Sequence, residues 1–500
     1  MIFSKNQSGI KNLSSAKAFV YFVCIGLFLP LLSIFYYSIN TNSFDFPIGT
    51  FNYFKDTFVL IFLTSAITII MGVLPAWLIT RFDIKYKSIL DLLLVIPLAI
   101  PGYIMSYTYA DILGYNGLLD IFLQNKFNVS LKFDVLTIEW LSLFLAFSLY
   151  PYVYTTSRIA FNLISNTYID LISSLGISNI KSFIKIILPL SASAIISGTF
   201  LVAMEILNDY GAVKYFGINT FSVGIFKYWF SMDQKDSAII FSLFLILLVI
   251  AILLITNFVK RNNLKKNLYI KSSSFGSKKI DNKMSNFFIH FILLVPVFFA
   301  FLVPLLFIIK NIFIYYSFYN YQEILIALRN SLLLAFISAI IITILTFIIL
   351  CIERYVKNSK LNILIDLLTS GYAIPGAVIG LSIMLIIKFF GESINFLIGT
   401  IFLLIYSYIF RFIAVAIYPL KSNLQRLPER FDELAKSLGF NYLKIFFKIN
   451  LPLSKIALIS SFLIVFIDVF KELPLTLILR PFNFETLATQ AYQYADDEML

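Results

Sequence analysis

A chain of 500 residues with 60% hydrophobic and 13% charged residues cannot cover a soluble fold of this size with polar surface. Its apolar runs are long and continuous rather than alternating, which excludes a transmembrane barrel and predicts an all-α, polytopic membrane protein. The net charge of +12 is typical of basic cytoplasmic loops in such a protein, and we expect no nucleic-acid partner.

Apolar runs long enough to cross a bilayer core of about 30 Å recur along the whole chain. In order they occupy residues 17–39, 57–80, 88–112, 138–160, 187–208, 238–259, 286–309, 331–353, 361–388, 396–419 and 453–472. A polar, basic stretch lies between the sixth and the seventh run. We therefore expect a first transmembrane half at 1–259, a cytoplasmic linker at 260–285 and a second transmembrane half at 286–500.

Basic residues gather in every second connection between these runs. They occur in the N-terminal segment, in 81–87, in the linker and in 354–360. Because Lys and Arg collect in cytoplasmic loops, this pattern predicts a cytoplasmic N-terminus. We expect a multi-pass protein in contact with membrane lipid.

The two halves repeat short sequences in the same order. Ser65-Ala66-Ile67 recurs as Ser338-Ala339-Ile340, Arg81 as Arg354, and Ile100-Pro101-Gly102 as Ile374-Pro375-Gly376. A repeat that keeps its basic loops on one side of the membrane predicts two parallel halves related by a pseudo-two-fold axis along the membrane normal. The first half carries extra residues, which we place in the outer loop 110–137.

The most specific repeat is a polar, basic insert between two apolar runs. In each copy an acid precedes a glycine by six residues, and a Leu-Pro pair ends thirteen residues after that glycine. An acid at the head of a helical turn, a glycine at its end and a proline in the next first turn fit a short helix that turns sharply. Two copies with one spacing favour a docking surface for a partner subunit over a surface helix without a partner. The residues are Asp170, Gly176, Leu188 and Pro189 in the first copy, and Glu433, Ala435, Gly439, Leu451 and Pro452 in the second.

Paired acids follow the fifth apolar run of each half. Glu205 aligns with Asp468, and Asp209 aligns with Glu472, at the offset that relates Gly176 to Gly439. Residues four apart share a helix face, and acids near membrane depth normally face a cavity or a partner. These acids are candidates for a substrate path; the alternative is exposure at an outer helix end with Lys471 as a local neutraliser.

One Pro-Gly pair falls inside the third apolar run of each half. Proline removes a helix hydrogen bond and glycine loosens packing, so Pro101-Gly102 and Pro375-Gly376 predict interrupted helices. They are either kinks for close packing or hinges for alternating access. The cysteines and the histidine offer no metal spacing, and we assign no metal site.

The paired inserts resemble the EAA motif of ABC importer permeases, in which an acid, small residues, a glycine and a final Leu-Pro recur at this spacing. The first copy departs from the family's letters, with Asp170-Leu171-Ile172 in place of Glu-Ala-Ala, whereas the second has Glu433-Leu434-Ala435. The stretch from Lys471 to Thr489 looks like the ferric-iron branch of these permeases, whose two halves are fused in one chain.

This resemblance implies the type I importer permease fold, a location in the bacterial cytoplasmic (inner) membrane, and a function. In the family the insert is a coupling helix that fits a groove on an ATPase subunit. We therefore expect two copies of an ABC ATPase on the cytoplasmic face, engaging 165–189 and 428–452, and a periplasmic or extracellular substrate-binding protein. Ferric iron prefers carboxylate and phenolate oxygens, so Glu205, Asp209, Asp468 and Glu472 suit its path, with Tyr210 a weaker candidate.

The chain itself contains no G-x-x-x-x-G-K-[ST] motif, so we expect a transport subunit that is not an enzyme and has no cofactor of its own. ATP and magnesium would be bound by the partner ATPase. Permeases for polyamines, thiamine or phosphonates are alternatives, and a gradient-driven secondary transporter is the rival class.

The second half stops short of a counterpart to the sixth run. In the first half, Asp233 to Asp236 lead directly into that run, and Asp233 falls on Asp496 of the second half. We expect the natural protein to continue beyond Leu500 with a twelfth apolar helix of about 20 residues that returns the C-terminus to the cytoplasm.

Overall fold

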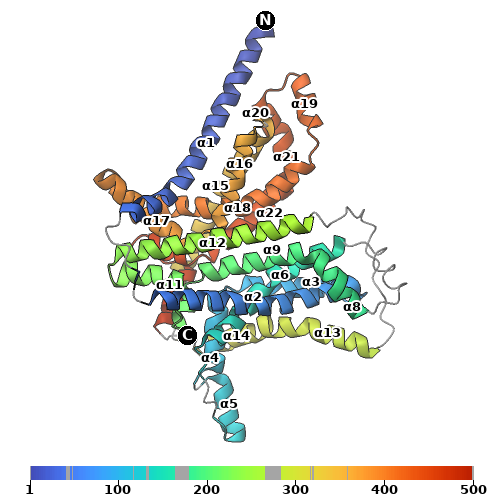
Figure 1. Ribbon diagram of the computed structural model, residues 1–500, viewed down its shortest axis with the longest axis vertical. Coiled ribbons are helices and arrows are strands. Elements are labelled where there is room, and N and C mark those ends of the chain that lie inside the picture. The colour runs from blue at the N-terminus through green and yellow to red at the C-terminus, as the bar shows by residue number, and fades with distance from the viewer. Residues whose placement is uncertain are drawn as a thin grey trace. The chain divides into compact units, whose positions relative to one another are not determined.

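A computed structural model describes residues 2–40, 46–47, 49–115, 117–130, 134–163, 179–264, 283–315, 317, 320–356 and 358–497. Every regular element in these ranges is a helix, which confirms the predicted all-α class (Figure 1). The elements form two compact units. Each unit combines most of one sequence half with the first helix of the other half.

The unit comprising residues 45–319 and 494–500, here called the first-half unit, contains most of the first sequence half. Its elements are α2 (Thr50–Arg81), α3 (Lys87–Val95), η1 (Ile96–Ala99), α4 (Gly102–Leu113), α5 (Leu118–Phe127), α6 (Ile138–Leu163), α8 (Asn179–Ser182), η2 (Phe183–Ile187), α9 (Leu188–Asn208), α10 (Gly211–Tyr215), α11 (Phe221–Phe226), η3 (Lys227–Ser231), α12 (Lys235–Leu264), α13 (Lys283–Val297), η4 (Phe298–Leu302) and α14 (Val303–Tyr315).

The unit comprising residues 1–44 and 320–493, here called the second-half unit, contains most of the second sequence half. Its elements are α1 (Ile2–Asn40), α15 (Tyr321–Val356), α16 (Ser359–Leu368), η6 (Thr369–Ala373), α17 (Gly376–Phe390), η7 (Gly391–Leu397), α18 (Ile401–Arg426), α19 (Arg430–Ser437), α20 (Tyr442–Ile445), η8 (Phe446–Asn450), α21 (Leu451–Leu453), α22 (Lys455–Phe470), α23 (Pro474–Leu479) and the greater part of α24 (Leu487–Asp496).

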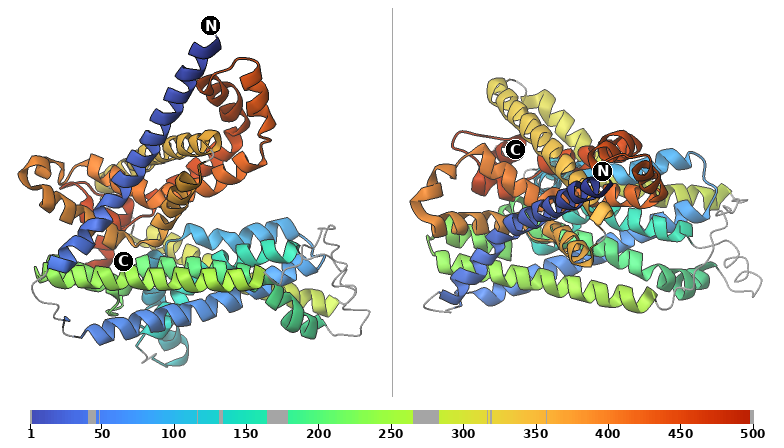
Figure 2. Two further views of the ribbon diagram at one scale, coloured as in Figure 1. Left: turned by 45° about the horizontal axis from the view of Figure 1, so that its top comes forward. Right: turned by 90° about the horizontal axis from the view of Figure 1, so that it is seen from above.

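Long helices packed side by side form the core of each unit. In the first-half unit α2 packs along α6, α6 along α9, and α9 along α12, an arrangement visible from three sides (Figures 1 and 2). In the second-half unit α15, α18 and α22 pack against one another in the same way. The buried seams are apolar, with small residues such as Gly72 and Gly198 allowing close backbone approach to α6.

The first helix of each sequence half packs in the unit of the other half. α1 contacts α15, α16 and α17, whereas α13 and α14 contact α2, α3 and α4. The predicted boundaries at 259 and 286 follow the order of the repeat along the chain, and the compact units group these first helices differently. Most of the predicted linker 260–285 lies outside the described residues.

Eight helices in the described ranges are long and apolar enough to cross a membrane, and two strongly bent pairs bring the number to ten. The predicted span 138–160 is the continuous helix α6, which does not belong to that set. The predicted span 361–388 is divided into α16, η6 and α17. The spans at 88–112 and 453–472 fall on the two bent pairs, whose bends are 89° and 74°.

Candidate functional site

The second insert folds as a short helix that ends in a glycine turn. Glu433 lies in the first turn of α19, as the sequence predicts. At its end Gly439 has φ +82°, its N–H donates to the Lys436 carbonyl, and Phe440 N–H donates to the Ala435 carbonyl. This pair of bonds is a Schellman motif, which requires the left-handed conformation that glycine adopts without strain.

The insert presents apolar side chains to its surroundings. Leu438 is 77% exposed and Leu434 is 62% exposed, and Phe431 is also exposed, whereas Ala435 is buried. An exposed apolar face on a polar, basic segment is typical of a surface that another protein covers.

The end of α15 holds the insert at two points. The guanidinium of Arg354 lies 2.5 Å from the Asp432 carboxylate and also donates to the carbonyls of Leu427, at 3.0 Å, and Pro428, at 3.2 Å. The next residue, Tyr355, accepts a hydrogen bond of 2.7 Å from the buried Asn450 side chain. The sequence marked Arg354 only as a repeat position, and no local pattern pointed to Tyr355 or to Asn450.

The prediction that the Leu-Pro pair restarts a helix is wrong, because the chain is already helical before the pair in both copies. A π-helical turn, η2 in the first copy and η8 in the second, comes directly before the pair. It continues without a break into α9 at Leu188 and into α21 at Leu451, so Pro189 and Pro452 follow a π-helical turn rather than a helix start. Asp170 and Gly176 of the first insert lie outside the described residues.

In the second-half unit the second acid is half of a buried ion pair. Arg411 Nε of α18 lies 3.5 Å from Glu472 Oε2, and both side chains are 4% exposed. Glu472 Oε1 also accepts a hydrogen bond of 3.0 Å from the Leu475 N–H at the start of α23. The first acid, Asp468, lies 3.0 Å from Lys471 Nζ, as the alternative reading predicts, but the exposure that this reading also predicts is wrong, because the Asp468 and Glu472 side chains are only 12% and 4% exposed.

In the first-half unit neutral groups hold the corresponding acids. Asp209 Oδ1 accepts a hydrogen bond of 2.9 Å from the Ala212 N–H, the same three-residue step that Glu472 makes. Tyr152 OH donates to Glu205 Oε1 at 3.2 Å. The position of Arg411 is occupied by Ser148 in the first repeat. The two repeats therefore place acids alike but neutralise them differently.

The prediction that both acids of a pair share one helix face is wrong for the second pair; in the first pair Asp209 caps α9 with φ −69°, and its N–H still donates to the Glu205 carbonyl four residues before it. α9 ends at Asn208 and α22 ends at Phe470, so Asp209 and Glu472 lie in the turn after the long helix. There each carboxylate bonds to the first turn of a short helix, α10 or α23. Such a bond gives a partner to an N–H group that has none within the short helix. The position of the carboxylate is therefore set by this hydrogen bond and not only by its spacing along the long helix.

The Pro-Gly pairs interrupt their helices, and each glycine lies against the acid just described. Pro101 and Pro375 stand directly before α4 and α17, each after a 3₁₀ turn. A Cβ on Gly102 would lie 3.3 Å from Asp209 Oδ2, and a Cβ on Gly376 would lie 2.9 Å from Glu472 Oε1. Glycine at these two positions therefore allows the backbone at the helix break to approach the carboxylate this closely. The hinge role of the Pro-Gly pairs stays a prediction.

Two further ion pairs repeat between the halves. Arg158 Nη2 on α6 lies 2.5 Å from Asp91 on α3, and Lys421 Nζ on α18 lies 2.9 Å from Asp366 on α16. Each ties the helix before a Pro-Gly break to a neighbouring long helix, α6 or α18. Sequence reasoning missed both, because their partners are far apart along the chain.

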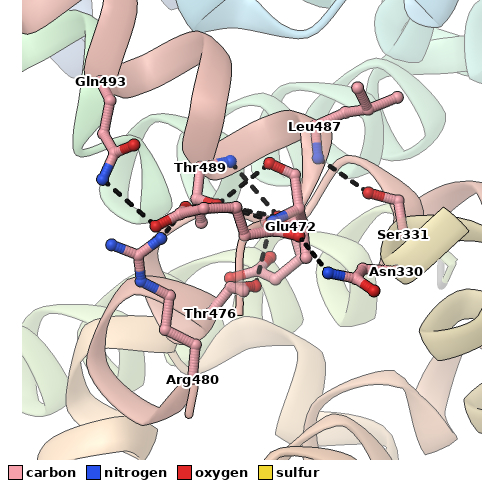
Figure 3. A network of polar contacts seen from close by, with 10 residues as sticks. Asn330, Ser331, Glu472, Thr476, Arg480, Leu487, Thr489 and Gln493 are labelled. Carbon is pink, nitrogen blue, oxygen red and sulfur yellow. Dashed lines mark hydrogen bonds and ion pairs between the residues drawn. The ribbon is translucent and has the colours of Figure 1, made fainter. Parts of the chain in front are cut away.

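A network of polar contacts in the second-half unit joins α15 to the segment 480–493 (Figure 3). Glu485 pairs with Arg480 and accepts hydrogen bonds from Thr489 at 2.7 Å and from Gln493 at 3.3 Å. From α15, Asn330 donates to the Glu485 carbonyl at 3.0 Å. Ser331 Oγ accepts from the Leu487 N–H at 2.8 Å.

Within the described ranges, no three His, Cys, Asp or Glu side chains come together as the ligands of one metal ion would.

A family model described as the inner membrane component of binding-protein-dependent transport systems matches residues 66–266 and 348–500, once in each repeat. The chain belongs to this family. It is a multi-span permease subunit of an ABC importer, a class of transport protein that works with an ATPase and a substrate-binding protein.

The chain is also similar in sequence to individual permeases of this kind. The Fe(3+)-transport system permease protein FbpB 2 of Haemophilus influenzae is 25% identical over 458 residues, covering 89% of the chain and 84% of the relative. The sulfate permease CysT of Salmonella typhimurium is 28% identical over 211 residues, covering 40% of the chain and 72% of the relative. The molybdenum permease ModB of Haemophilus influenzae is 24% identical over 39% of the chain and 87% of its own length.

Proposed function

We propose that this permease carries ferric iron, delivered by an external binding protein, into the cytoplasm. The alignment with FbpB 2 carries the proposal, because it runs through both fused halves and covers 89% of the chain. The sulfate and molybdenum permeases align over 40% and 39% of the chain.

The chemistry of the acids supports a cationic substrate. Ferric iron is a hard cation that prefers oxygen ligands, and four carboxylates lie in the last turns of the long helices α9 and α22 or just after them. Glu205 and Asp209 are held by a hydroxyl and an amide, whereas Asp468 and Glu472 face Lys471 and Arg411. We assign the path to all four carboxylates, and to the second pair a structural role as well, because of its ion pairs with Lys471 and Arg411.

The coupling role of the inserts is part of the same proposal. Two ATPase copies engage 165–189 and 428–452 on the cytoplasmic face, and the N-terminus lies on that side. The exposed Leu434 and Leu438 and the rigid turn at Gly439 support it, because they form a shaped apolar contact surface. Closure of the ATPase then switches the path from inward-facing to outward-facing.

Reconstitution tests this function. The permease, its ATPase and its binding protein are placed in proteoliposomes, and uptake of labelled ferric iron, sulfate and molybdate is measured with ATP and without it. ATP-dependent uptake of ferric iron alone supports the proposal. Uptake of sulfate or molybdate would assign an oxyanion substrate, and the same assay with labelled polyamine, thiamine and phosphonate tests the remaining alternatives. Uptake driven by a proton gradient in the absence of ATP would assign a secondary transporter.

A further inference from the structure

The second insert is bound to a helix that is distant from it in sequence. α18 leads into the insert and α22 leads out of it, yet its strongest polar contacts go to α15. We call the group formed by Arg354 and Tyr355 of α15 with Asp432 and Asn450 the insert clamp. The Arg354 and Asp432 side chains are only 10% and 8% exposed, so solvent screens their attraction weakly.

A second polar group lies toward the other end of α15. Asn330 and Ser331 hold the backbone at Glu485 and Leu487 (Figure 3). We call these four residues the loop clamp. Asn330 and Arg354 are separated by about 36 Å along the helix at 1.5 Å per residue, which exceeds the hydrocarbon thickness of a bilayer. One helix thus joins backbone on both sides of the membrane core.

α15 is built to transmit movement along its length. It runs for 36 residues without a proline or a glycine, whereas its counterpart α2 contains Gly72 and Pro75. Sharp kinks arise at proline, glycine or π-bulges, and α15 is a single α-helix. A displacement at the insert clamp therefore moves the loop clamp rather than being absorbed by a bend.

The loop clamp is continuous with the buried acid. Arg480, which pairs with Glu485, ends α23, and Glu472 bonds to the first turn of the same helix. Glu472 in turn lies against Gly376 at the break before α17. A continuous series of covalent bonds, hydrogen bonds and contacts therefore connects the insert through α15 to the Pro375-Gly376 break.

We propose that α15 is a transmission rod, with Arg354 as the positioning residue that converts movement of the second insert into movement of the 480–489 segment and of the Pro375-Gly376 break. This inference rests on the proposed function, because it needs the insert to be the contact with the ATPase. It predicts that weakening either clamp uncouples ATP hydrolysis from transport: less substrate is transported per ATP hydrolysed, although the two clamps lie far apart along α15.

The test measures uptake and ATP hydrolysis in the same proteoliposomes, with the ATPase and the binding protein present. Arg354→Lys keeps the charge but replaces the planar guanidinium, whose separate nitrogens reach Asp432, Leu427 and Pro428, with three N–H groups on one atom. Asn330→Leu keeps the volume and removes the donor to Glu485. Arg329→Lys is the matched control, since Arg329 is an exposed neighbour on the same helix.

Both clamp variants should assemble, hydrolyse ATP within about twofold of the unmodified complex and transport about tenfold less substrate per ATP, as coupling energies between sites allow. Arg329→Lys should change neither rate. An unchanged ratio, or equal loss of uptake and hydrolysis in both clamps, would overturn the inference. If Arg354→Lys fails to assemble, Tyr355→Phe replaces it; an unaltered ratio there contradicts the rod equally. Absence of binding-protein-stimulated hydrolysis in the unmodified complex would instead refute the proposed function.

Discussion

Replacing Arg411 with methionine tests the ion pair at the break of the second half. Its Nε lies 3.5 Å from Glu472 Oε2, and both side chains are 4% exposed. At an effective dielectric constant of about 20, charges at this separation attract by about 5 kcal/mol, and removing one member of a buried pair costs about 3–5 kcal/mol. Because 3.5 Å is long for a hydrogen bond, we expect the lower value, about 3 kcal/mol.

The double variant separates the pair from its members. Arg411→Met leaves Glu472 as a buried charge without its cation, whereas Arg411→Met with Glu472→Gln removes both charges and retains an oxygen for the Leu475 N–H. Such paired replacements are often nearly neutral, so the double variant should recover at least half of the loss. Arg329→Met, on an exposed arginine, is the control and should change little.

The assay is the rate of irreversible thermal inactivation of the detergent-solubilised permease, followed by the loss of monodisperse protein. A loss of about 3 kcal/mol that is fully expressed in the unfolding barrier accelerates inactivation roughly 100-fold. An Arg411→Met protein that inactivates within twofold of the unmodified one would refute the reasoning. So would a double variant that is as unstable as the sum of its two single variants, because the side chains would then not interact.

Three other predictions follow from the site. Gly439→Ala should strain the turn by about 1–2 kcal/mol because φ is +82°, and should reduce binding-protein-stimulated ATP hydrolysis while the permease still inserts into the membrane; normal stimulation would contradict it. Glu205→Gln should lower uptake of ferric iron at least about tenfold, whereas Asp468→Asn should lower it less; equal effects would remove the distinction between the repeats. Gly376→Ala should inactivate the solubilised permease faster than Gly102→Ala, since its Cβ meets a buried ion pair and that of Gly102 meets a leucine methyl at 2.9 Å; the reverse order would refute it.

Features that depend on neighbours in the chain were predictable. Gly439 ends α19 and Glu433 lies in its first turn, both as the spacing indicates. Caps and turns are decided by backbone bonds spanning a few residues, so the sequence contains the whole interaction. The break at Pro375-Gly376 was predictable for the same reason.

Features that depend on contacts between distant segments were not. The sequence identified Glu472 as an acid near membrane depth but did not identify Arg411 as its partner, which comes from α18. It marked Arg354 as a repeat position without indicating that its side chain holds the insert. A long basic side chain reaches several neighbours, and nothing local selects one of them.

The sequence by itself determined that this protein is an all-α membrane permease of two repeated halves, since continuous apolar runs and a twice-repeated insert admit few other structures. Only the tertiary structure decided which helices belong together: α1 packs with α15 to α17, and α13 and α14 pack with α2 to α4. The reason is that an apolar helix face gains nearly the same energy against any apolar partner, so hydrophobicity specifies burial but not the neighbour. The choice is made by shape and by a few paired polar groups, which come together only in the folded chain.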